Sequence, residues 1–128
     1  MLIRIFLAFI AVSFLGFGLW SLVDPLGMTS RMAVSVSGQN ALYEMRGAFG
    51  GISLGGALLA AAGALRPARY ERPALWFLAA YMGGYTLSRI FSVVAGDSPT
   101  VTGWAFGGFE VTCFILTCIA LRVRRHPE

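Results

Sequence analysis

The stretch Gly47–Leu65, GAFGGISLGGALLAAAGAL, is a run of 19 residues without a single charged side chain. A helix needs about 20 apolar residues to cross the ~30 Å hydrocarbon core of a bilayer. The run therefore predicts a membrane-spanning helix. Glu44 and Arg46 stand just before it, and we expect the whole span to cover about residues 44–65.

Three further apolar runs have a similar length, at about residues 5–23, 74–95 and 101–121. The third span contains one charge, Arg89, and the fourth contains one charge, Glu110. The predicted fold class is therefore all-α: an integral membrane bundle of four helices.

The composition supports this fold class. Apolar residues make up 57% of the 128 residues and charged residues 12%, with a mean hydropathy of +0.73. A soluble chain of this size would lack the polar side chains to cover its surface, and the length fits one domain over residues 1–128. The net charge of +4 does not indicate nucleic-acid binding, because the arginines flank apolar spans instead of forming a basic surface stripe.

The arginines also predict the orientation in the membrane. Four spans place both termini on one side, and loop arginines are retained in the cytoplasm. Only Arg31 falls in a loop on the opposite side. We therefore expect a multi-pass protein of the bacterial inner membrane with both termini cytoplasmic. The arginines on that side are Arg4, Arg66, Arg69, Arg72, Arg122, Arg124 and Arg125.

The longest connection, Leu26–Gln39, is the part that the sequence predicts least well. Alternation around Val34 and Val36 hints at a short extended piece, and an amphipathic segment on the membrane surface is equally compatible with it. Asn40 is the expected N-cap of the second span.

Small residues recur every fourth position within three of the spans. Such ridges let helices approach closely, so they favour packing seams over ligand clefts. In the third span the ridge runs beside the stripe Tyr81, Tyr85 and Arg89. The predicted packing positions are Gly47, Gly51, Gly55, Gly84, Ser88, Gly103 and Gly107.

Charged residues inside or beside the spans are the candidate site. At 1.5 Å per residue, Arg89 lies about 9–10 Å and Glu110 roughly 10–14 Å below the outer surface, so the two can pair. Glu44 is expected to face the bundle, whereas Arg46 points away and extends to the headgroups. A buried charge costs at least ~2.5–3.5 kcal/mol and marks a functional candidate, although a structural clasp is the competing interpretation. The candidate ligand-binding or partner-binding residues are Glu44, Arg46, Tyr85, Arg89 and Glu110.

The sequence carries no arrangement typical of catalysis. It has no set of nucleophile, base and orienting residue, and it has no phosphate-binding loop. Because His126 is its single histidine, the sequence offers no group of metal ligands. Cys113 and Cys118 point apart on one helix and cannot form a disulfide with each other. We therefore expect no cofactor and no metal, and enzymatic activity is unsupported.

The order of features resembles a bacterial family of small four-helix inner-membrane proteins catalogued as a domain of unknown function. More distantly it resembles the DoxX-type membrane proteins. The resemblance supports the fold and implies no activity. The features that carry it are Asp24-Pro25, Glu44-Met45-Arg46-Gly47, Gly50-Gly51, Ser88-Arg89, Gly96-Asp97-Ser98-Pro99 and Glu110.

Three functions fit these observations. The first is an integral membrane protein that binds a lipid-like or quinone-like amphiphile, or that serves as an accessory subunit for a membrane-protein partner or a second copy. The second is a small proton-coupled transporter in which Glu110 changes protonation. The third is a membrane enzyme acting on lipid head groups.

Overall fold

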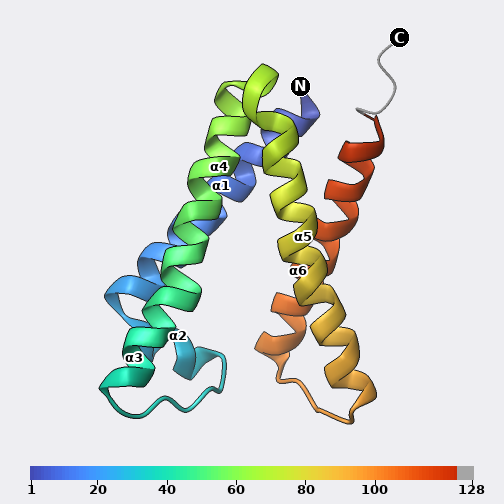
Figure 1. The fold of residues 1–128 in the computed structure, drawn as a ribbon. Helices are drawn as coiled ribbons and strands as arrows, with labels where there is room; N and C mark the ends of the chain where they lie inside the picture. Colours follow the sequence, from blue (N-terminus) through green and yellow to red (C-terminus); the bar gives the residue numbers. More distant parts are fainter. Residues whose placement is uncertain (124–128) are drawn as a thin grey trace. The chain divides into compact units, whose positions relative to one another are not determined.

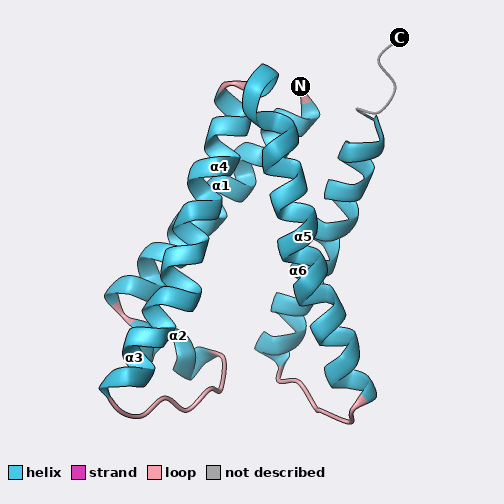
Figure 2. Ribbon diagram, viewed as in Figure 1, coloured by secondary structure: helices cyan, strands magenta, loops and turns pink. Residues whose placement is uncertain are grey.

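The computed structural model describes residues 1–123, and in that part of the chain all regular structure is helical (Figure 1, Figure 2). The expectations for Arg124, Arg125 and His126 lie outside the described residues. The chain divides into two compact units, Met1–Ala74 and Leu75–Glu128. The single domain over residues 1–128 stays a prediction.

Unit 1 is built on two long antiparallel helical segments. They are α1 and a continuous segment composed of α3, the π-helical turn η1 and α4 (Figure 1). The short helix α2 follows α1 directly. The bounds are Leu2–Val23 for α1, Pro25–Arg31 for α2, Gln39–Met45 for α3, Arg46–Gly51 for η1 and Ile52–Leu65 for α4.

The closest approach between the two segments occurs at two glycines, Gly18 in α1 and Gly50 in η1. A Cβ atom placed on Gly18 would lie 3.0 Å from Leu54 and 3.2 Å from the carbonyl oxygen of Gly50. A Cβ atom on Gly50 would lie 2.7 Å from the side chain of Leu22. The absence of side chains here lets the backbones approach, which is how helices commonly pack within membranes.

Arginines hold both ends of this helix pair. The Nε atom of Arg4 donates a 2.9 Å hydrogen bond to the carbonyl oxygen of Ala64, near the end of α4. The Nε atom of Arg46 donates a 3.1 Å hydrogen bond to the carbonyl oxygen of Leu22, near the end of α1. The last four carbonyls of a helix have no partner within it and carry partial negative charge. Each arginine therefore satisfies an acceptor that the other segment leaves open.

The second segment contains a π-helical turn, η1. In η1 the backbone N–H of Ile52 donates to the carbonyl oxygen of Gly47, five residues earlier, so the turn contains one residue more than an α-helical turn. Gly50 faces α1 and shares a helix face with the buried residues Ala57 and Ala60. The predicted ridge of Gly47, Gly51 and Gly55 is exposed and has no side chain of a neighbouring described helix within 4 Å of its Cβ positions. A packing role for this ridge against another chain stays a prediction.

The connection between the two segments starts with the short helix α2, and residues 34–37, where an extended piece was one expectation, have no regular secondary structure. A position on the membrane surface stays a prediction. The carboxylate of Asp24 accepts a 2.9 Å hydrogen bond from the backbone N–H of Gly27 and caps α2, and Pro25 occupies the first helical position. The second segment begins at Gln39, after Gly38, whose φ of 86° suits glycine. The N-cap is thus Gly38, and the prediction of Asn40 was wrong by two residues.

The helices α5 (Pro67–Val94) and α6 (Val101–Val123) follow the second segment. The helix α5 begins earlier than the expected span, because Pro67 needs no N–H partner in a first turn. Pro73 lies inside α5 and removes one backbone hydrogen bond there without ending the helix. In unit 2, α5 and α6 contact each other where a Cβ atom on Gly83 would lie 2.9 Å from the ring of Phe114.

Among residues 1–123, three helical segments are long and apolar enough to cross a membrane, as expected of a membrane protein: Leu2–Val23, Gln39–Leu65 and Val101–Val123. Large apolar side chains are also exposed on the helix faces that point away from the packing seams. In α1, Ile5, Phe9 and Val12 are more than half exposed, whereas Leu7 and Ile10 on the opposite face are fully buried. Apolar character on every side of a helix is typical of membrane spans.

A pair of glycine substitutions tests the seam in unit 1. Gly18→Val should lower the free energy of unfolding by about 1–3 kcal/mol, the usual cost of overpacking, because the added atoms meet Leu54 and the η1 backbone. Gly16→Val is the matched control, since a Cβ atom at Gly16 has no contact within 4 Å. Unfolding by SDS titration in detergent micelles measures both. Equal stability of the two variants would contradict this packing.

Candidate functional site

The Arg89–Glu110 ion pair joins α5 to α6 and is the centre of the candidate site. The Nε atom of Arg89 donates to Oε2 of Glu110 at 2.8 Å, and its Nη2 atom donates to Oε1 at 2.9 Å. Two parallel hydrogen bonds between a guanidinium and a carboxylate form the strongest and most directional ion pair that proteins use. The pairing predicted from the sequence is therefore present.

The two partners differ in exposure. The side chain of Glu110 is 10% exposed and that of Arg89 is 43% exposed. Gly107 faces the aliphatic part of the Arg89 side chain, and a Cβ atom there would lie at an ordinary contact distance of 3.8 Å from it. The carboxylate is thus enclosed, while part of the guanidinium faces outward.

Aromatic rings extend this pair along one face of α5. The rings of Phe77 and Tyr81 stack with centroids 5.5 Å apart, and Tyr81 meets Tyr85 edge to face at 5.0 Å. The guanidinium carbon of Arg89 lies 5.8 Å from the centroid of the Tyr85 ring, within cation–π distance. Because these residues recur every fourth position, they form a continuous row that ends at the ion pair.

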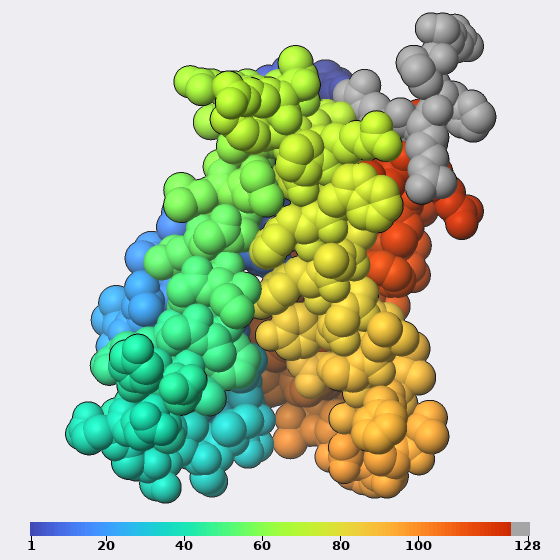
Figure 3. Space-filling view, in the orientation of Figure 1, coloured from blue at the N-terminus to red at the C-terminus, as the bar shows by residue number. Residues whose placement is uncertain are grey.

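An open groove of about 340 Å³ lies on α5 beside this row, on the helix drawn in yellow in Figure 3. Ala80, Gly84 and Ser88 form its floor, and Tyr81 and Tyr85 form its wall. Gly84 has open space where a side chain would stand. The small residues that the sequence predicted as a packing seam therefore line a groove within the described structure.

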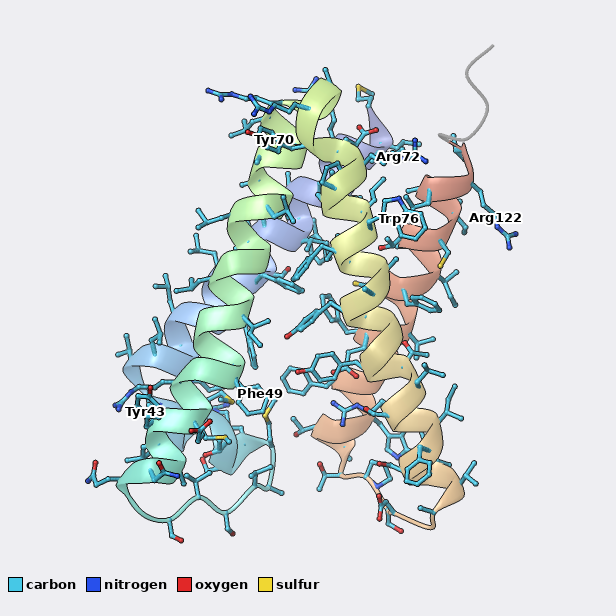
Figure 4. All side chains as sticks on the ribbon, viewed as in Figure 1. Tyr43, Phe49, Tyr70, Arg72, Trp76 and Arg122 are labelled. Carbon is cyan, nitrogen blue, oxygen red and sulfur yellow. The ribbon has the colours of Figure 1, made fainter. Side chains whose placement is uncertain are left out.

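The other two candidate site residues lie in unit 1, and both are exposed. Glu44 belongs to α3, and Arg46 binds the end of α1 as described above. Arg46 thus serves as a helix clamp in this structure, and its extension to the headgroups stays a prediction. Figure 4 labels Tyr43 and Phe49, which flank these charges in sequence. A common cluster of Glu44 and Arg46 with the Arg89–Glu110 pair stays a prediction.

Thr86 is a further residue that the sequence analysis missed. Its hydroxyl is buried and has no hydrogen-bond partner among the described residues. It lies on the α5 face between Gly83, which contacts α6, and Arg89. Other buried hydroxyls, such as that of Thr117, donate to a carbonyl of their own helix. No sequence signal separates Thr86 from Thr117, since each is a threonine within an apolar helix.

Chemically the site offers hydrogen-bond donors, aromatic faces and a balanced pair of charges. Among residues 1–123, no group of three or more His, Cys, Asp or Glu side chains is arranged to hold a metal ion. The buried thiol of Cys113 is a free cysteine in α6. These groups suit recognition of a molecule more than bond cleavage.

The fold and site define a class: a small, all-helical protein of membrane type with an intramolecular ion pair beside an aromatic groove. Residues 2–121 match the domain of unknown function DUF4345, and the chain belongs to this family. The family's description assigns no activity. No curated protein and no solved structure matches the chain.

A double-mutant cycle tests the energetic role of the pair. Arg89→Leu and Glu110→Leu should each destabilise the protein, because each leaves one charge without its partner. The double variant should be more stable than the sum of the two losses predicts, with a coupling of about 1–3 kcal/mol. The cycle of Glu110→Leu with Arg122→Leu, at the far end of α6, is the control and should be additive. Unfolding in detergent micelles gives the stabilities that both cycles need.

Proposed function

We propose that this protein is an integral inner-membrane binding protein that holds an amphiphilic molecule in the α5 groove, with the polar end of that molecule at Arg89. The single observation that carries this proposal is the position of the groove, whose wall residue Tyr85 contacts the Arg89–Glu110 pair. A role as an accessory subunit of a membrane complex is the alternative form of this proposal.

Burial and charge support a site over a mere clasp. A clasp needs both charges enclosed, whereas the Arg89 side chain remains 43% exposed beside the groove. The helices α5 and α6 also have close contacts that do not involve charge, such as Gly83 with Phe114. An ion pair is costly to bury and adds little to that packing. Its presence therefore fits a binding role better.

The proposal includes four membrane spans with both termini in the cytoplasm. The helix α5 would be the third span, made less apolar than the others by Arg89 and by its tyrosines. Indole rings favour the membrane–water interface. In unit 2, Trp76 lies at the same end as Arg122, opposite the α5–α6 loop (Figure 4). This arrangement is typical of a cytoplasmic boundary. A relation to the DoxX-type proteins is part of the same proposal.

Cysteine labelling tests the topology. In a background without Cys113 and Cys118, single cysteines at Ser35 and Ala68, both exposed, should react from opposite sides of the membrane. A membrane-impermeant maleimide applied to intact spheroplasts should label Ser35→Cys only. Labelling of both from outside would contradict the four-span arrangement.

Filling the groove tests the binding function. Gly84→Leu should leave folding unchanged, because its side chain enters open space, yet it should remove a co-purifying amphiphile. Gly108→Leu on α6 is the control, since that position also has no contact within 4 Å and lies outside the groove. Native mass spectrometry reports the bound mass. A ligand retained equally by both variants would place binding elsewhere.

A proton-coupled carrier is the second candidate, and one observation favours it. Glu110 is a buried carboxylate, and α5 also carries the buried hydroxyl of Thr86, which has no hydrogen-bond partner among the described residues. A hydroxyl can accept a hydrogen bond from a protonated carboxyl group and so stabilise it after it leaves Arg89. Solute uptake driven by a pH gradient into proteoliposomes, lost in Glu110→Gln, would favour this function.

A further inference from the structure

We propose that the α5 groove selects an amphiphile whose head is flat and uncharged and carries hydrogen-bond acceptors, such as ring carbonyls, over one with an anionic head. This inference deepens the proposed function and rests on it. Charge balance, the remaining hydrogen-bond donors and the shape of the groove each support it.

The charge of the site is already balanced. Both carboxylate oxygens of Glu110 bind Arg89, at 2.8 and 2.9 Å. An anionic head at hydrogen-bond distance from Arg89 would therefore also stand close to Glu110, and in a low dielectric this repulsion offsets the attraction of the guanidinium. A neutral acceptor gains hydrogen bonds without that repulsion.

Arg89 still has donors to offer. A guanidinium carries five N–H groups, and the pair uses one on Nε and one on Nη2. The remaining N–H groups have no acceptor among the described residues, and the side chain is 43% exposed. Tyr85 lines the groove and lies under the guanidinium. Arg89 thus lies next to the groove, beside its lining residue Tyr85 and not within the lining itself, and we place the head of a bound molecule there.

The shape of the groove favours a flat head. Tyr81 and Tyr85 form a wall of aromatic rings, and planar rings pack well in offset or edge-to-face geometry against such a wall. The floor consists of Ala80, Gly84 and Ser88, so it leaves room for a ring but supplies no charge. The Ser88 hydroxyl is engaged with the carbonyl oxygen of Tyr85 at 3.0 Å. A volume of about 340 Å³ lies at the lower end of ligand pockets in proteins.

Probes with one tail and different heads test this selectivity. The full-length protein in phosphatidylcholine nanodiscs is given radiolabelled decyl-benzoquinone, decanoate or decylphosphocholine. Nanodiscs with the Gly84→Leu variant measure partition of each probe into lipid. We expect the wild-type protein to bind the quinone about tenfold more tightly than decanoate, a difference of about 1.4 kcal/mol. Glu110→Gln, which frees the charge of Arg89, should reverse this order.

The outcomes separate this inference from the proposed function. Tighter binding of decanoate or decylphosphocholine than of the quinone by the wild-type protein would overturn the inference while leaving the groove as the site. Specific binding of no probe above the Gly84→Leu background would overturn both. A dimer that Gly84→Leu dissociates would show that a second copy occupies the groove, which also overturns the inference. If Glu110→Gln does not fold, the wild-type order of the three probes still decides the question.

Discussion

Hydrocarbon offers no hydrogen-bond partner, so polar groups in helices that are apolar enough to span a membrane have to find partners within the protein. Hydroxyls in the helices bond to carbonyls of their own helix, as Ser21 does to Phe17 and Thr112 does to Gly108. Arg89 and Glu110, the charges within the apolar runs of α5 and α6, are paired with each other. Because this demand is met so widely, the exceptions are informative: the exposed part of Arg89 and the hydroxyl of Thr86 retain hydrogen-bonding capacity.

The pairing of Arg89 with Glu110 could be predicted from the sequence, because it depends on how far each residue lies along its helix. Arg89 and Glu110 are single charges in long apolar runs, and the rise of a helix alone places them at similar heights. The row of Tyr81, Tyr85 and Arg89 follows equally from a four-residue repeat. The repeat does not predict whether the adjacent small residues pack against a helix or face open space, because that depends on where the next helix lies.

The seam of unit 1 was not predicted. The four-residue repeat of glycines indicated Gly47, Gly51 and Gly55 as the packing positions, but in the structure Gly50 faces α1. The π-helical turn could not be predicted either, because the sequence RGAFGG carries no feature that requires such a turn. The clamps made by Arg4 and Arg46 were missed for a related reason: their acceptors are backbone carbonyls, which have no signature in the sequence.

The π-helical turn has a consequence for how the family can vary in length. Such a turn is geometrically equivalent to one residue inserted into an α-helix, so loss of one residue between Arg46 and Gly51 would convert it to ordinary α-helix without breaking the segment. Everything before the turn would then rotate by about 100° relative to α4. Arg46 would leave the carbonyl of Leu22, and the surface of α3 presented to the outside would change. A single codon could thus redirect one end of the protein while the rest of its core stays intact.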